Sequence, residues 1–187
     1  FRLFIFAPAD DAGGPGGAVA ALCDWLEHDP SSPVRRHTAP GEDVDAVIDT
    51  RAVFQQGFRA LDFGAMPTLL RPHVGRYGLC DYEKVFCADV KRGADIFEMR
   101  GIDRAAGCMV VVRPDQYVGT ILPLHARDDL AEYFAAILRV RGGPADASRT
   151  LAGSPRSENK VARAIFRSRQ VGSGKRGQTC LSTRAVI

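Results

Sequence analysis

The sequence lacks any long apolar run. Its most apolar stretches, residues 108–112 and 118–122, have only the length of strands, whereas a membrane-spanning helix needs about 20 consecutive apolar residues. No basic-then-apolar segment of the secretory type opens the chain. We therefore expect a cytoplasmic protein with no membrane partner. Its start at Phe1, rather than at a methionine, is typical of a fragment or a processed product.

Cysteines are few, and none has the spacing that redox chemistry needs. A thioredoxin-type thiolate normally lies in a Cys-x-x-Cys motif in the turn after the first strand, where a helix N-terminus stabilises it. The matching turn here, residues 8–17, contains no cysteine. The chain has five scattered cysteines, which are Cys23, Cys80, Cys87, Cys108 and Cys180. This pattern predicts reduced thiols without a redox role rather than a disulfide framework.

Metal-binding and nucleotide-binding motifs are missing as well. The histidines lie far apart, at His28, His37, His73 and His125. They lack the two- to five-residue spacing of zinc ligands. Residues 13–17 (Gly-Gly-Pro-Gly-Gly) do not have the spacing of a dinucleotide fingerprint, and residues 169–176 carry arginines where a phosphate-binding loop needs Gly and Ser or Thr. We therefore expect no cofactor-binding or metal-binding residue in this chain.

The net charge of +3 conceals two segments of opposite sign. Residues 142–187 hold nine Lys and Arg against two acidic residues, while residues 1–141 hold 16 against 20. Residues 1–141 have the periodicity of a folded domain, whereas residues 142–187 are rich in Ser, Gly and Arg and lack such periodicity. We predict one domain over residues 1–141 and a basic, largely disordered tail over residues 142–187. Because the body itself is mildly acidic, the overall positive charge does not indicate a nucleic-acid groove there, and we expect no nucleic-acid partner. For the tail, the alternative is nonspecific binding to RNA or to an anionic membrane.

Within residues 1–141 the pattern of apolar residues predicts strands and helices in a definite order. The expected elements are a strand at 1–6, a helix at 19–27, a strand at 47–54, an irregular stretch at 63–82, strands at 85–88, 108–113 and 117–122, a helical turn at 95–100 and a helix at 127–141. This order contains a βαβ half followed by a ββα half. It predicts an α/β fold of the thioredoxin-like type.

The last helix shows the clearest periodicity. Its expected buried face consists of Leu130, Tyr133, Phe134, Ile137 and Leu138. These residues follow the i, i+3, i+4, i+7 spacing of one helix face. Arg139 and Arg141 suit the negative end of the helix, and the Gly-Gly-Pro sequence at 142–144 provides its stop.

The two strands before this helix form a hairpin around a proline turn. Residues 110–112 are all valine, which favours an extended, buried chain. In the turn, Asp115 is placed to accept backbone N–H groups and to pair with Arg113. Gly119 leaves a gap that another backbone or a large ring can approach closely.

Several of these segments together resemble the end of the phenol hydroxylase (phenol 2-monooxygenase) family of FAD-dependent aromatic monooxygenases, including its 3-hydroxybenzoate hydroxylase members. The resemblance extends over roughly residues 1–140. It is carried by residues 1–6, 81–89 (Asp-Tyr-Glu-Lys-Val-Phe-Cys-Ala-Asp), 101–103 (Gly-Ile-Asp), 107–119 (Gly-Cys-Met-Val-Val-Val-Arg-Pro-Asp-Gln-Tyr-Val-Gly), 122–124 (Leu-Pro-Leu) and 133–134 (Tyr-Phe).

This resemblance implies a non-catalytic, thioredoxin-like dimerisation domain of an FAD- and NADPH-dependent aromatic hydroxylase. The implied partners are a separate flavin-binding domain of the same enzyme and a second subunit in a homodimer. Candidate interface residues are Arg113, Asp115, Tyr117 and Gly119; the alternative is that these residues only build a tight hairpin. For the whole chain, the alternative is a stand-alone thioredoxin-like binding module without redox cysteines. The aromatic substrate is left open, because its pocket would lie in another domain.

Overall fold

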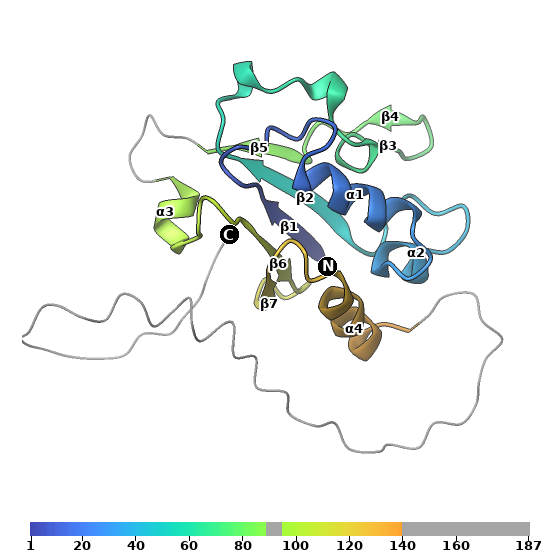
Figure 1. Ribbon diagram of the computed structural model, residues 1–187. Coiled ribbons are helices and arrows are strands. Elements are labelled where there is room, and N and C mark those ends of the chain that lie inside the picture. Colours follow the sequence, from blue (N-terminus) through green and yellow to red (C-terminus); the bar gives the residue numbers. More distant parts are fainter. Residues whose placement is uncertain (89–94, 140–187) are drawn as a thin grey trace, which may run out of the picture.

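The computed structural model describes residues 1–88 and 95–139, which form a mixed α/β domain around a five-stranded sheet (Figure 1). The sheet order is β5-β2-β1-β6-β7. These strands are β1 (Arg2–Phe6), β2 (Asp49–Phe54), β5 (Val85–Cys87), β6 (Cys108–Val112) and β7 (Val118–Leu122). β1 runs parallel to β2, and β2 parallel to β5, whereas β6 is antiparallel to both β1 and β7. The α/β prediction is confirmed, and the β2-β1-β6-β7 order is compatible with the thioredoxin-like arrangement.

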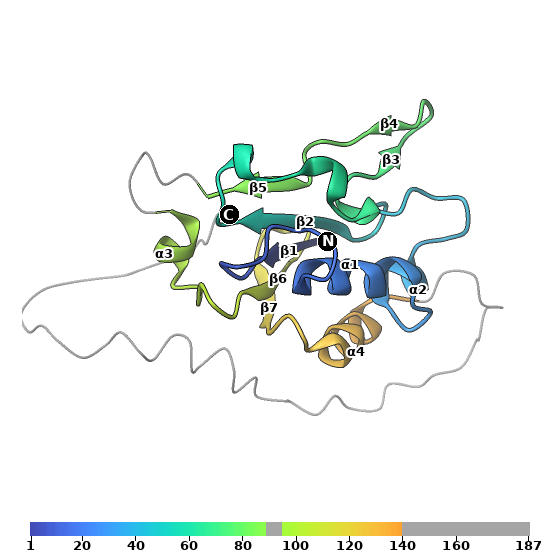
Figure 2. The same ribbon diagram turned by 45° about the horizontal axis from the view of Figure 1, so that its top comes forward.

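Helices cover the two faces of the sheet unequally (Figure 2). The larger core lies under α1 (Ala18–His28), α2 (Pro33–His37) and α4 (Arg127–Ile137), against Leu3 and Ile5 of β1. On the other face, Phe97 of α3 (Ile96–Arg100) packs edge-on against Phe6, with ring centroids 5.4 Å apart. Every residue of β6 is buried, because the strand has neighbours on both sides and both of its faces are covered. This confirms the buried strand that the valine run predicts.

The short helix α2, which follows α1 directly, is absent from the elements that the sequence predicts. The Ser32 hydroxyl accepts a hydrogen bond from the Arg35 N–H at 3.2 Å and so caps the new helix. Pro33 occupies the first helical turn, where its missing N–H costs nothing. Ser32 also donates to the Leu26 carbonyl oxygen of α1 at 2.7 Å, which fixes the corner between the two helices.

The irregular stretch between β2 and β5 contains more order than the sequence predicts. Three short 3-10 turns follow β2, namely η1 (Phe58–Ala60), η2 (Phe63–Ala65) and η3 (Thr68–Leu70). A small hairpin of β3 (His73–Val74) and β4 (Leu79–Cys80) comes next. Its turn depends on Gly75 and Gly78, whose φ angles of 71° and 58° favour glycine. We call residues 71–80 the arm.

The end of α4 differs from the prediction. The helix stops at Ile137, four residues earlier than expected, so Arg139 lies outside it. Leu130 and Phe134 are fully buried as predicted, but Ile137 is half exposed. After the helix, the chain turns toward α2, where the His37 Nδ1 lies 3.0 Å from the Arg139 carbonyl oxygen. This tertiary contact overrides the helical periodicity. Arg141, the 142–144 stop and the predicted tail lie outside the described residues.

Candidate interaction surface

In the turn after β1, where thioredoxin-type chemistry would place a thiolate, a buried carboxylate caps α1. Asp11 accepts hydrogen bonds from the N–H groups of Gly13 and Val19, both at 2.8 Å. A Cβ atom on Gly17 would overlap this carboxylate, so glycine is required there. The positive end of α1 is therefore neutralised by the protein's own anion.

Three thiols in or near the sheet, two of them buried, are poor nucleophiles. Burial raises the pKa of Cys23, inside α1, far above its ordinary value. Burial also raises the pKa of Cys108 to about 11, and that of Cys87 in the same direction. The described cysteines form no disulfide. Because thiolates are the reactive species, these three thiols are kept in their unreactive protonated form at neutral pH.

The predicted interface residues lie on the β6–β7 hairpin, and all four are exposed. The Arg113 guanidinium donates to the Asp115 carboxylate at 2.7 Å, which confirms the predicted local pair. The N–H of Gln116 donates to the Arg113 carbonyl oxygen at 2.9 Å and closes the turn, with Gln116 in a left-handed conformation (φ 67°). The side chain of Tyr117 is 53% exposed and therefore lies outside the core. The turn thus presents an arginine, a carboxylate and a tyrosine to solvent.

Gly119 has an internal reason for being glycine. It is the extra residue of a bulge, because Val118 pairs with Val112 and Thr120 pairs with Val111. A Cβ atom at Gly119 would overlap the hydroxyl of Tyr133 on α4. The large ring expected to approach Gly119 is therefore one from the same chain. Gly119 shapes the hairpin, which leaves Arg113, Asp115 and Tyr117 as the exposed groups.

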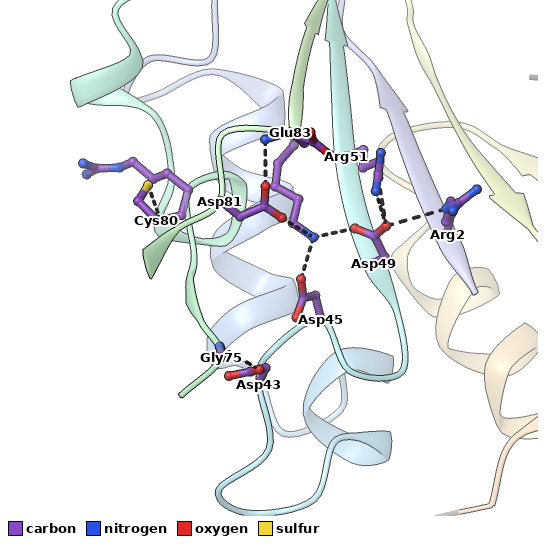
Figure 3. Close-up of polar contacts among 11 residues, drawn as sticks. Arg2, Asp43, Asp45, Asp49, Arg51, Gly75, Cys80, Asp81 and Glu83 are labelled. Carbon is purple, nitrogen blue, oxygen red and sulfur yellow. Dashed lines mark hydrogen bonds and ion pairs between the residues drawn. The ribbon is translucent and has the colours of Figure 1, made fainter. Parts of the chain in front are cut away.

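Beside the sheet, a buried ammonium group is surrounded by carboxylates (Figure 3). The Lys84 side chain is only 3% exposed, and its Nζ lies 2.5 Å from Asp45, 2.6 Å from Asp49 and 3.3 Å from Asp81. Burial alone lowers the pKa of Lys84, but the hydrogen bonds to Asp45 and Asp49 outweigh it, so its pKa lies above the ordinary value. The Glu83 N–H, with Lys84 adding to its effect, lowers the pKa of Asp81.

This Lys84 cluster extends in two directions. Toward β1, the second oxygen of Asp49 pairs with Arg51 at 2.8 Å and with Arg2 at 3.7 Å. Toward the arm, the neighbouring Asp43 accepts a hydrogen bond from the Gly75 N–H at 3.0 Å. In these ion pairs three carboxylates face three cations, so their charges balance; the groups are Asp45, Asp49 and Asp81 against Lys84, Arg51 and Arg2. The sequence alone does not reveal the cluster, because the two carboxylates nearest to the Lys84 ammonium belong to residues 39 and 35 positions away.

Exposed apolar side chains gather on the arm and beside it. Tyr77 is 79% exposed and Leu79 67% exposed. Tyr82 is also exposed and stacks on Phe63 with ring centroids 5.2 Å apart. The arm and the β6–β7 turn lie at the same end of the sheet. In the strand register, the first residue of β1 lies beside the first residue of β2 and the last residue of β6, so the β6–β7 turn is at the end where β1 and β2 begin. The arm is hydrogen-bonded to the loop before β2, which is at that end as well. We call this the Phe1 end.

The described residues do not meet the requirements of a metal site or of a membrane-spanning helix. No group of His, Cys, Asp and Glu within residues 1–88 and 95–139 is arranged to hold a metal ion. In the same ranges, no helix has the length and apolar character to cross a membrane. The surface at the Phe1 end is therefore suited to contact with another protein more than to chemistry.

Comparison with known proteins gives one family and two relatives. Residues 1–142 match the model of the family described as phenol hydroxylase, C-terminal dimerisation domain. A 3-hydroxybenzoate 4-monooxygenase from Comamonas testosteroni is 47% identical over 140 residues, which are 74% of this chain and 22% of that protein. The FAD-dependent monooxygenase terD from Aspergillus terreus is 25% identical over 113 residues, which are 59% of this chain and 18% of that protein. The chain thus spans about a fifth of the length of these relatives.

Proposed function

The chain belongs to the phenol hydroxylase C-terminal dimerisation domain family, and from this membership we propose that it joins the subunits of a larger FAD- and NADPH-dependent aromatic hydroxylase. The observation that carries the proposal is the family match over residues 1–142. The names of the two relatives, an aromatic-acid monooxygenase and an FAD-dependent monooxygenase, support it. The domain itself, residues 1–141, is non-catalytic in this proposal.

FAD does not fit the described part of this chain. A flavin dinucleotide is normally bound with its pyrophosphate against a helix N-terminus. The turn before α1 comes nearest to such a site, but the Asp11 carboxylate already accepts its N–H groups and would repel a phosphate. We therefore assign FAD and NADPH to a separate domain of the enzyme.

The partners that we propose are the flavin-binding domain of the same enzyme and a second copy of the subunit, in a cytoplasmic homodimer. Of the hairpin residues, Arg113, Asp115 and Tyr117 are candidates for direct contact, and Gly119 for shaping the hairpin. Tyrosine and arginine are enriched in interfaces, because they combine large area with polar groups. The exposed ring of Tyr117 is thus the side chain on this turn most suited to a subunit contact.

Sedimentation of the purified chain over a concentration series tests this proposal. We expect a reversible dimer, and we expect Tyr117→Ala to weaken it by about 2 kcal/mol, or roughly 30-fold in Kd. Met99→Ala is the control, since Met99 is exposed on α3 at the opposite end of the sheet. A chain that stays monomeric at all concentrations and ignores an added flavin domain would refute the proposed function. If the dimer forms and Tyr117→Ala does not weaken it, only the assignment of the contact to the hairpin is wrong.

A further inference from the structure

We propose that the arm, residues 71–80, is a docking element for a second copy of this chain. The inference rests on the proposed function and deepens it, because it adds to the subunit contact a second surface that does not include the hairpin residues. The arm combines an exposed apolar tip, an ordered base and a charge opposite to that of the body.

The tip of the arm lacks the packing that a hairpin normally needs. β3 and β4 have two residues each and form a sheet of their own, separate from the main one. Figure 2 shows the arm standing clear of the main sheet. An isolated two-stranded hairpin is marginally stable in water unless its apolar side is covered. Here Tyr77 and Leu79 are among the most exposed large apolar side chains of the described residues. Such a surface is suited to burial in an assembly.

The base of the arm is held in place despite this exposure. The Gly75 N–H bonds to Asp43 at 3.0 Å, and the Asp81 N–H bonds to the Pro72 carbonyl oxygen at 2.9 Å. Asp81 in turn pairs with the buried Lys84 (Figure 3). The arm is thereby ordered before it meets a partner, so docking loses less conformational entropy than it would with a loose loop.

Charge favours a second copy of this chain as the occupant. The arm contains Arg71 and Arg76 and no acidic residue, while the rest of residues 1–141 holds 14 Lys and Arg against 20 acidic residues. A basic arm and an acidic body attract each other when two copies meet. The Arg76 guanidinium lies over the Tyr77 ring at 5.7 Å, so the tip pairs two residue types that often dominate interface energies. Two-fold symmetry would use both arms at once.

The chain contains a matched control for the tip. Arg59 lies over the ring of Phe58 at 5.6 Å, and Phe58 is 73% exposed. This pair repeats the chemistry of Arg76 and Tyr77. It belongs to η1, which follows the last residues of β2 and therefore lies at the end of the sheet opposite to the arm.

Sedimentation of the full 187-residue chain compares Tyr77→Ala with Phe58→Ala, and Arg76→Glu with Arg59→Glu. We expect each arm variant to raise the dimer Kd about tenfold or more, and each η1 variant to change it by less than about twofold. If all four variants leave the wild-type dimer unchanged, or if the arm variants and the η1 variants weaken it equally, the arm is not the contact. The proposed function stays intact in either case. A wild type that stays monomeric overturns the assignment of the arm, and one that also ignores an added flavin domain overturns the proposed function as well.

Hydrogen exchange gives a readout that does not depend on any variant. In the wild-type chain, the backbone amides of residues 73–80 should exchange more slowly as the protein is concentrated and the dimer forms, while those of η1 should not change. Equal exchange of the arm amides in monomer and dimer contradicts the proposal. If the arm instead becomes protected only when a flavin domain is added, the occupant is that domain and the assignment to a second copy is wrong.

Discussion

Single residues decide which chemistry this domain can host. Asp11 occupies the helix N-terminus that would stabilise a thiolate, while Cys23 is one turn further along in the buried interior of α1. Gly119 shows the same principle in β7, because its missing side chain makes room for Tyr133. In both places a residue identity that invites a functional explanation is accounted for by a neighbour within the same chain.

Gly119→Ala should destabilise the domain by about 1–3 kcal/mol, because the new methyl group and the Tyr133 hydroxyl cannot share one space. Adding Tyr133→Phe removes that hydroxyl, and the double variant should recover part of the loss. Urea unfolding of the four proteins in the cycle measures the coupling. Gly57→Ala is the control, since a Cβ atom there meets nothing within 4 Å. Additive losses, with no rescue by Tyr133→Phe, would contradict the steric explanation.

Among the elements, those with strong local patterns are the ones that the sequence predicts. The valine run of β6 and the start of α4 need only their own residues to be recognised. The arm is different, since strands of two residues are too short to show any periodicity. The Lys84 cluster cannot be predicted for another reason. Ion pairs between residues more than 30 positions apart produce no pattern in the local sequence. Local pattern therefore predicts the main sheet and the β6–β7 turn, and it misses the arm and the Lys84 cluster.

Lys84→Met should cost about 3 kcal/mol of stability at neutral pH, because it leaves Asp45, Asp49 and Asp81 facing one another without their central cation. The loss should shrink on acidification, as the three carboxylates take up protons and cease to repel each other. Urea unfolding at several pH values measures this. Arg113→Met, which breaks an exposed pair, is the control and should cost less than about 1 kcal/mol. A penalty independent of pH would show that lost packing, not charge, is responsible.

In the wild-type protein, the stability that these ion pairs contribute should be lost at both low and high pH. The pKa of Asp81 is lowered by folding, so its contribution is present above its unfolded value and disappears as the pH falls through the folded one. The pKa of Lys84 is raised, so its contribution is complete below its unfolded value and disappears as the pH rises through the folded one. The cluster is thus a stabilising feature across the whole neutral range.

At the scale of the whole molecule, the domain combines a well-packed interior with an unevenly covered exterior. Within the residues that the structure describes, three helices cover one face of the sheet, whereas the five-residue helix α3 packs on the other. The Phe1 end carries exposed aromatic groups on both the arm and the β6–β7 turn. This distribution supports our proposal that the domain is one part of a larger assembly.

The purified chain should bind no FAD and should not oxidise NADPH in the presence of phenols. The reason is that the sequence has no dinucleotide fingerprint and that Asp11 occupies the N-terminus of α1. Absorbance of the purified protein, and its fluorescence after FAD is added, measure binding. The FAD-dependent monooxygenase terD serves as the positive control. A yellow preparation with stoichiometric flavin would contradict our assignment of the cofactor to another domain.

The position of β1 in the centre of the sheet has a consequence for how the chain is made. β1 is the first strand in the sequence, yet it pairs with β2 on one side and, on the other, with β6 roughly a hundred residues later. During synthesis the βαβ half can assemble early, but one edge of its most apolar strand stays open until β6 leaves the ribosome. Open strand edges promote aggregation, and pairings of such long range form slowly. The final third of the domain therefore decides whether the first third folds or aggregates.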